Sequence, residues 1–101
     1  MIAITSTGNQ LNSPMDMRFA RCPYFLFLKE TENEFIQNPF HEAEGHIAPQ
    51  VVQWLKEQGI TRLITGEIGS IAKNSLKESQ IQTVLIDNDK YTIQAILNKL
   101  K

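Results

Sequence analysis

Three side chains that could bind a transition metal lie in two polar stretches of the sequence. Cys22 is the single cysteine among 101 residues, and His41 and His46 are the two histidines. Thiolate and imidazole are soft to borderline donors, so the three residues together predict a transition-metal site. A metal-binding thiol needs a low pKa, and we expect the neighbouring charges of Arg18 and Arg21 to lower the pKa of Cys22.

Each of these three residues also has a simpler interpretation. Cys22 could be a small side chain packed at the entrance of a strand, and the two histidines could be solvated loop residues. A typical iron–sulfur cluster takes four thiolates, and this chain has one. Cys22 would therefore hold a preassembled cluster with open positions, or one shared across a dimer.

Two arginines and a glycine-containing segment are candidates for binding an anion. Arg18 and Arg21 could hold a negatively charged cluster or a phosphate, or they could fix the loop in which they lie. Gly66, Gly69 and Ser70 join a predicted strand to a predicted helix, where exposed backbone N–H groups favour anions. The alternative is a tight turn, because the segment lacks the lysine of a Walker motif and the third glycine of a dinucleotide fingerprint.

The elements that must position these residues follow from the apolar pattern. Short runs rich in apolar residues predict five strands, at 2–5, 24–28, 34–37, 60–65 and 82–86. Apolar residues at helical spacing predict helices at 47–55, 70–79 and 93–100. Gly59 is placed to stop the first helix, and Asp89 to cap the last.

The order of these elements predicts one α/β domain over residues 1–101. A hairpin followed by two strand–helix units, joined by right-handed crossovers, gives a mixed five-stranded sheet with three helices on its faces. The strand order is 3-2-1-4-5 with strand 2 antiparallel, which is a ribonuclease H-like three-layer arrangement. No internal repeat or linker interrupts it.

Composition narrows the classes of function. A net charge of -1 argues against binding bulk nucleic acid, which needs a basic surface. We expect a cytoplasmic protein, because a lone cysteine suits a reducing compartment and the sequence lacks a signal peptide or a run of ~20 apolar residues.

The stretch from Asp16 to Phe25 resembles the signature of the nitrogenase iron–molybdenum cofactor biosynthesis family (NifX and NafY type). It reads Asp-Met-Arg-Phe-Ala-Arg-Cys-Pro-Tyr-Phe. Other matching positions are Ser6-x-Gly8, Asn38-Pro39, Gly45 and Gly66-x-x-Gly69. The resemblance covers essentially the whole chain.

This resemblance implies a ribonuclease H-like fold and a non-enzymatic protein that binds or carries an iron–sulfur cluster or an iron–molybdenum cofactor precursor. Their chemistry makes Arg18, Arg21, Cys22, Gly66, Gly69 and Ser70 the expected cofactor-binding residues. We expect a larger metalloprotein or an ATPase as the partner, and a monomer or a weak homodimer.

Two other functions remain open. One is an accessory docking domain without a metal of its own, which an exposed Trp54 would favour. The other is a minimal ribonuclease H-like hydrolase. The sequence favours this less, because the first strand carries none of the carboxylates that would hold two metal ions.

Overall fold

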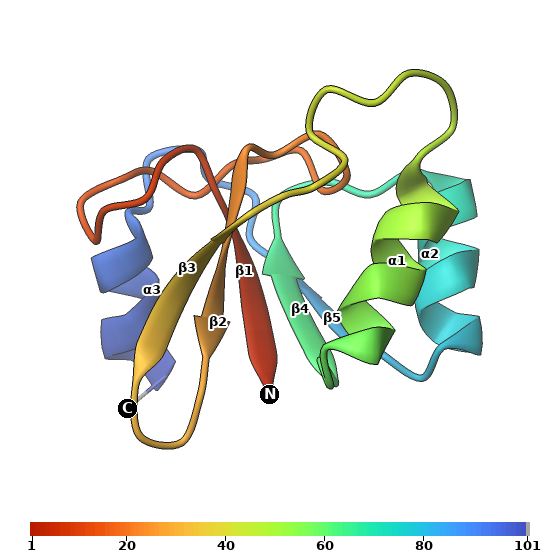
Figure 1. The fold of residues 1–101 in the computed structure, drawn as a ribbon. Coiled ribbons are helices and arrows are strands. Elements are labelled where there is room, and N and C mark those ends of the chain that lie inside the picture. Colours follow the sequence, from red (N-terminus) through yellow and green to blue (C-terminus); the bar gives the residue numbers. More distant parts are fainter. Residues whose placement is uncertain (101) are drawn as a thin grey trace.

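A five-stranded mixed sheet forms the centre of the protein, with helices on both of its faces (Figure 1). The computed structural model describes residues 1–100. The strands are β1 (Ile2–Ser6), β2 (Tyr24–Leu28), β3 (Asn33–Gln37), β4 (Arg62–Thr65) and β5 (Gln82–Leu85). The helices are α1 (Ala48–Glu57), α2 (Ser70–Glu78) and α3 (Ile93–Leu100).

The strand order is β3-β2-β1-β4-β5, as the sequence predicts. Central β1 pairs antiparallel with β2, where Ile2 lies opposite Leu28, and parallel with β4, where Ile2 lies opposite Arg62. The hairpin pair β2–β3 is antiparallel and the outer pair β4–β5 is parallel. The predicted sheet with an antiparallel second strand is therefore confirmed.

Alternate residues of each strand point to opposite faces of the sheet, which builds two cores. Ala3 belongs to the core beneath α1 and α2, and its neighbour Ile4 to the core beneath α3. Val51 and Leu55 of α1 fill the first core, and Ile93 of α3 fills the second. Within residues 1–100, no helix combines the length and apolar character needed to cross a bilayer.

The start of α3 corrects one sequence prediction. Thr92, not Asp89, caps this helix: its Oγ1 accepts a hydrogen bond of 3.1 Å from the Ala95 backbone N–H. Just upstream, Asn88 Oδ1 accepts from the Lys90 N–H at 2.9 Å, which closes a separate turn. Because of that turn the helix begins only at Ile93, so Asp89 lies four residues before the first residue of α3 and does not cap it.

Trp54 packs against other aromatic side chains and is not fully exposed to solvent. Its ring centroid lies 5.7 Å from those of Phe25 and Phe27, and the side chain is half-buried. The exposed tryptophan that would have favoured a docking surface is therefore not found.

Three loops meet at one end of the sheet, at the top of Figure 1. Residues 7–23 follow β1, residues 38–47 follow β3, and residues 66–69 follow β4. The carboxyl ends of parallel strands β1 and β4 point to this end. All the candidate site residues of the sequence analysis lie in or beside these loops.

Candidate functional site

The loop of residues 7–23 is fixed across the ends of β1 and β4. Thr5 Oγ1 donates to the Asp16 carbonyl at 2.6 Å and lies 2.9 Å from Thr65 Oγ1. The Asp16 N–H donates to the Thr5 carbonyl at 3.0 Å, and the Glu67 N–H to the Met17 carbonyl at 2.7 Å. A polar segment is thereby held against the sheet by hydrogen bonds and not by apolar packing alone.

Asp16 and Arg18 form a forked ion pair inside this loop. Asp16 is 4% exposed; its Oδ1 accepts from the Arg18 backbone N–H at 2.9 Å and from Nε at 3.1 Å. Oδ2 accepts from Nη2 at 2.9 Å. Hydrogen bonding to Asp16 raises the pKa of Arg18, and the guanidinium stays charged. The Arg18 side chain is 62% exposed, so this fixed charge faces solvent.

Arg21 joins the first loop to the loop of residues 38–47. Its guanidinium donates to the carbonyls of Ala43 and Gly45, the second at 2.8 Å. Gly45 has a φ of 85°, a left-handed conformation that glycine adopts without strain. Arg21 therefore has a structural role and also brings a positive charge to this end of the sheet.

Asn38 makes a second connection between the same loops, and the sequence analysis did not single out its side chain. Its Nδ2 donates to the carbonyls of Ala20 and Cys22, at 3.0 and 2.8 Å, and its Oδ1 accepts from the Phe40 N–H at 3.0 Å. The sequence did contain a signal for this role, because Asn38 directly precedes Pro39. Proline has no backbone N–H, and an asparagine side chain in a turn often supplies hydrogen bonds to nearby backbone groups.

Cys22 lies inside the first core. The side chain is fully buried, and Asn38 Nδ2 is 4.0 Å from its Sγ. Burial raises the pKa of Cys22 and the charge of Asp16 raises it further, while Arg18 has only a small opposing effect. The expected lowering of this pKa by nearby arginines is wrong, because loss of solvation outweighs their attraction.

The predicted trio of Cys22, His41 and His46 does not assemble. His46 is exposed and His41 half-buried, whereas Cys22 is enclosed. Throughout residues 1–100, no three His, Cys, Asp or Glu side chains are grouped so that they could hold a metal ion.

Three of the residues predicted to bind an anion line one depression. A depression with a volume of about 450 Å³ lies between the first loop and the start of α2. Its lining includes Arg18, Arg21 and Gly69 from the predicted set, and also Phe19, Ala20, Ala48, Glu67, Ile68, Ile71 and Ala72. Ser70, the first residue of α2, directly follows Gly69.

The start of α2 offers backbone donors to this depression. Gly69 is the N-cap and provides no side-chain cap, and the first backbone bond of the helix runs from the Lys73 N–H to the Gly69 carbonyl at 2.9 Å. The N–H groups of the three preceding residues thus have no acceptor within the helix and carry partial positive charge.

Gly66 has a different role from Gly69. A Cβ at Gly66 would lie 2.7 Å from Met17 Cα, so glycine allows the two loops to touch. A Cβ at Gly69 would meet no atom within 4 Å. Of the two glycines, Gly69 alone lines the depression.

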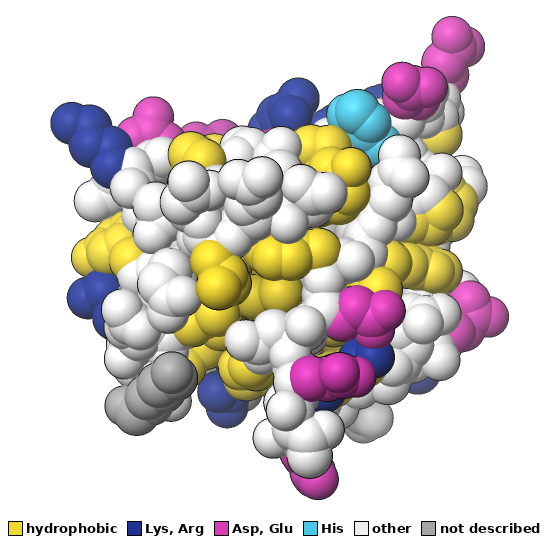
Figure 2. Space-filling view, turned by 60° about the vertical axis from the view of Figure 1, so that its left-hand side comes forward, with side chains coloured by type: hydrophobic (Ala, Val, Ile, Leu, Met, Phe, Trp, Pro, Cys, Tyr) yellow, Lys and Arg dark blue, Asp and Glu magenta, His cyan; other side chains and the backbone are white. Residues whose placement is uncertain are grey.

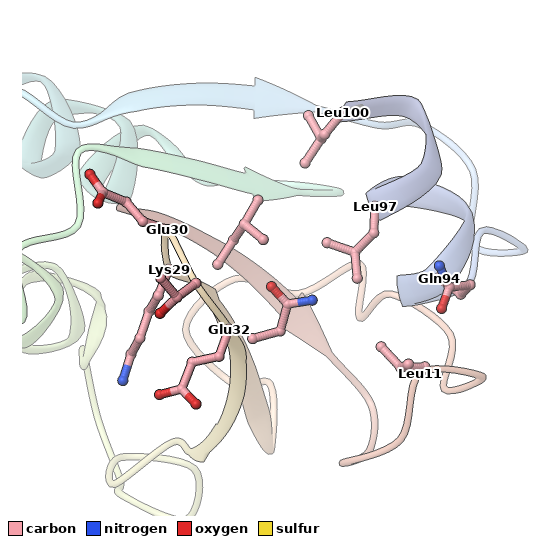
Figure 3. A pocket seen from close by; sticks show the side chains of 10 residues that line it. Leu11, Lys29, Glu30, Glu32, Gln94, Leu97 and Leu100 are labelled. Atoms are coloured by element: carbon pink, nitrogen blue, oxygen red, sulfur yellow. The ribbon is translucent and has the colours of Figure 1, made fainter.

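A second depression lies on the opposite side of the sheet, between the β2–β3 hairpin and α3. Figure 2 shows hydrophobic side chains gathered near the centre of a face, with acidic side chains beside them. In Figure 3, Leu11, Leu97 and Leu100 lie on one side of this depression, which has a volume of about 320 Å³, with Glu30 and Glu32 of the hairpin opposite. None of the predicted site residues lines it.

Comparison with known proteins identifies the family. The family model described as "Dinitrogenase iron-molybdenum cofactor" matches residues 1–101. The chain belongs to this family. The resemblance expected from Asp16 to Phe25 is thus confirmed over the full sequence. No curated protein sequence is significantly similar to this family member.

Several solved structures resemble this member of the dinitrogenase iron–molybdenum cofactor family, among them the following two. A Thermotoga protein described as a candidate NifB protein is 30% identical, with a TM-score of 0.77 over 98% of this chain and 84% of that one. The apo form of the orange protein from Desulfovibrio gigas is 24% identical, with a TM-score of 0.87 over 98% of this chain and 84% of that one. The second likeness supports the fold alone.

Proposed function

We propose that this protein is a non-enzymatic carrier that binds an anionic iron–sulfur cluster or iron–molybdenum cofactor precursor in the depression beside α2. The observation that carries the proposal is the meeting of two guanidinium groups with the uncapped start of a helix. Family membership supports a cofactor-related cargo. We place the carrier in the cytoplasm, with a larger metalloprotein or an ATPase as its partner.

The charges of the depression suit an anion. Arg18 directs Nε and Nη2 to Asp16, and among the residues described no acceptor contacts its Nη1, which is left for cargo. Arg21 supplies a second positive charge, and the first-turn N–H groups of α2 add a partial one. Glu67 also lines the depression, and solvent screens its charge as it screens that of Arg18, since both side chains are exposed. Asp16 offsets part of the Arg18 charge, so Arg21 and the start of α2 provide the remaining attraction.

The apolar part of the lining strengthens these interactions. Phe19 and Ala72 are buried, and Ile68 is half-buried, so the floor of the depression is apolar. A cargo seated there would displace water, and electrostatic attraction is larger where water is displaced, because the effective dielectric constant falls. A cargo seated on this floor would be held by charge and by shape together.

Direct ligation by Cys22 is a separate part of the proposal. The buried thiol would reach a cargo only if the loop of residues 7–23 opened, which breaks the hydrogen bonds of Asn38 to Ala20 and Cys22. His41 or His46 would then be a second ligand from the adjoining loop. Binding through the arginines and α2 needs no such opening.

A matched pair of variants at Gly69 tests the anion site. Gly69→Ala and Gly69→Asp both add a side chain where open space surrounds the new Cβ, and only aspartate caps α2 and adds a negative charge. After anaerobic incubation with an iron–sulfur cluster donor and desalting, we expect the wild type and Gly69→Ala to retain iron and visible absorption. Gly69→Asp should retain at least about threefold less iron than the wild type, because its carboxylate repels the anionic cargo. Equal retention by both variants would contradict the anion site.

Cys22→Ala tests ligation in the same assay. Retained cluster in this variant would exclude Cys22 as a ligand and leave the anion site as the binding element. Loss of the cluster, with an unchanged circular dichroism spectrum, would assign the thiol as a ligand. A wild-type protein that retains no iron would contradict the carrier function itself.

The alternatives have weaker support. In a minimal hydrolase, carboxylates would have to gather at the strand ends, but Asp16 is engaged by Arg18, and residues 1–100 hold no acidic cluster suited to metal ions. A docking domain without metal finds some support in the exposed edge of the sheet at β5.

A further inference from the structure

The edge strand β5 lacks the protection that edge strands usually have. It reads Gln-Thr-Val-Leu and carries no charge, and its Val84 and Leu85 are 39% and 54% exposed. At the opposite edge, β3 carries Glu34, which pairs with Lys29. Charged residues on an edge discourage pairing with other strands, so β3 is protected and β5 is open.

The backbone of β5 presents hydrogen-bonding groups outward at alternate residues. The Gln82 N–H donates to the Thr61 carbonyl and the Ile86 N–H to the Thr65 carbonyl, both at 2.9 Å. These residues therefore face β4, and the strand alternation turns Thr83 and Leu85 to the outside. Their N–H groups therefore point away from β4, the one strand between residues 1 and 100 that pairs with β5.

A groove runs beside this edge, between β5 and α2. It has a volume of about 440 Å³ and is lined by Thr83 and Leu85 of β5 and by Ile68, Lys73, Leu76, Lys77 and Ile81. Its floor is apolar, and both of its charged lining residues are lysines of α2. An added strand would lay alternate side chains into this groove.

We infer that β5 and this groove bind an extended, acidic segment of a partner protein, which adds a sixth strand to the sheet. The outward N–H and C=O groups of Thr83 and Leu85 would pair with the backbone of the segment. Its apolar side chains would cover Leu85 in the groove, and its acidic side chains would lie beside Lys73 and Lys77.

The lysines favour a partner segment over a second copy of this chain. If two copies paired β5 to β5 about a two-fold axis, the sheet would continue and α2 of both copies would lie on the same face. Lys73 and Lys77 of each copy would then face the like charges of the other, which is unfavourable. The acidic side chains of a partner segment would instead attract Lys73 and Lys77.

The groove adjoins the proposed cargo site. Ile68 lines both this groove and the depression that holds Arg18 and Arg21. A segment docked on β5 would therefore bring its protein next to the cargo. This consequence rests on the proposed function, whereas the docking itself does not.

Two blocked seven-residue peptides test the docking. Both have threonine at every other position; the three positions between, which would face the groove, are glutamate, valine and glutamate in one peptide and lysine, valine and lysine in the other. We would titrate each into isotopically labelled protein and follow backbone amide resonances. We expect the glutamate peptide to shift β5 and α2 resonances and to bind about tenfold more tightly than the lysine peptide. The measurement needs no metal, so it is independent of the carrier proposal.

Matched variants locate the interaction. Thr83→Pro removes an outward N–H and leaves the bonds to β4 in place. It should therefore lower the affinity for the glutamate peptide at least about tenfold. Gln37→Pro makes the same change on the outer side of β3 and should have no effect on binding. The double variant Lys73→Glu with Lys77→Glu leaves the backbone unchanged and should reverse the preference between the two peptides.

Three results would overturn the inference. They are absence of binding by the glutamate peptide, equal binding of the two peptides, and binding that survives both Thr83→Pro and the lysine reversal. Sedimentation tests the alternative partner. If the wild type self-associates and Thr83→Pro abolishes the association, the edge binds a second copy of the chain instead.

Discussion

At the scale of single residues, Asn38 holds two loops together with one buried amide. It is 2% exposed and bonds to Ala20, Cys22 and Phe40. Asn38→Ala would leave two carbonyls without their donor, and we expect it to lower the free energy of unfolding by about 2–4 kcal/mol. Urea unfolding measures this directly.

A second asparagine supplies the control for that measurement. Asn88 also accepts a backbone N–H, from Lys90, but it lies in an exposed turn where water can replace the bond. Asn88→Ala should cost less than about 1 kcal/mol. If the two variants lose equal stability, Asn38 does not have the connecting role described here.

The thiol of Cys22 gives a second prediction at this scale. Because burial raises its pKa, the thiol stays protonated at neutral pH and is closed to reagents. We expect an aromatic disulfide reagent at pH 8 to label the folded protein at least about a hundredfold more slowly than the urea-unfolded protein. Rapid labelling of the folded state would show that the loop of residues 7–23 opens readily, which is the condition for metal ligation by Cys22.

At the scale of secondary-structure elements, two glycines between β4 and α2 should respond differently to the same substitution. Gly66→Ala places a Cβ 2.5 Å from Met17 Sδ and 2.7 Å from Met17 Cα, so the loop must shift. We expect a loss of about 2 kcal/mol. Gly69→Ala meets open space and should change stability by less than about 0.5 kcal/mol, since the lower preference of alanine for the N-cap position and the stiffer unfolded chain offset each other. Thermal and urea unfolding compare the two, and equal losses would contradict the close approach of Met17.

The elements themselves were largely predictable from the sequence, because strand and helix periods are local properties. All five strands and three helices appear in the predicted order. The boundary errors have local causes. Strand β4 begins at Arg62 and not at Ile60, since the Ile60 N–H bonds back to Leu55 at the end of α1. The ribonuclease H-like label for this sheet order stays a prediction.

The site was less predictable, because its residues are positioned by contacts distant in the sequence. Arg18 and Arg21 were identified from charge, and they do line a common depression. The sequence left two interpretations of Cys22 open, a metal ligand or a packed side chain, and could not decide between them. Its burial depends on Asn38, sixteen residues away, and on how a polar loop folds over the sheet. The same reason explains why His46 shares no metal site with Cys22 among the described residues. The conformation of a loop depends on hydrogen bonds to distant parts of the chain, which the local sequence does not reveal.

At the scale of the whole molecule, the sheet order predicts a gradient of amide hydrogen exchange. Central β1 is paired on both sides, so the Ile4 amide should exchange only through global unfolding. In edge strand β5 the protection should alternate: the Val84 N–H faces β4, whereas those of Thr83 and Leu85 face outward. We expect Thr83 and Leu85 to exchange at least about a hundredfold faster than Val84 in dilute protein, and to become protected when the glutamate peptide is added. If Thr83 and Leu85 are already protected without peptide, and remain so on dilution, then β5 is covered within the monomer and cannot be the docking edge.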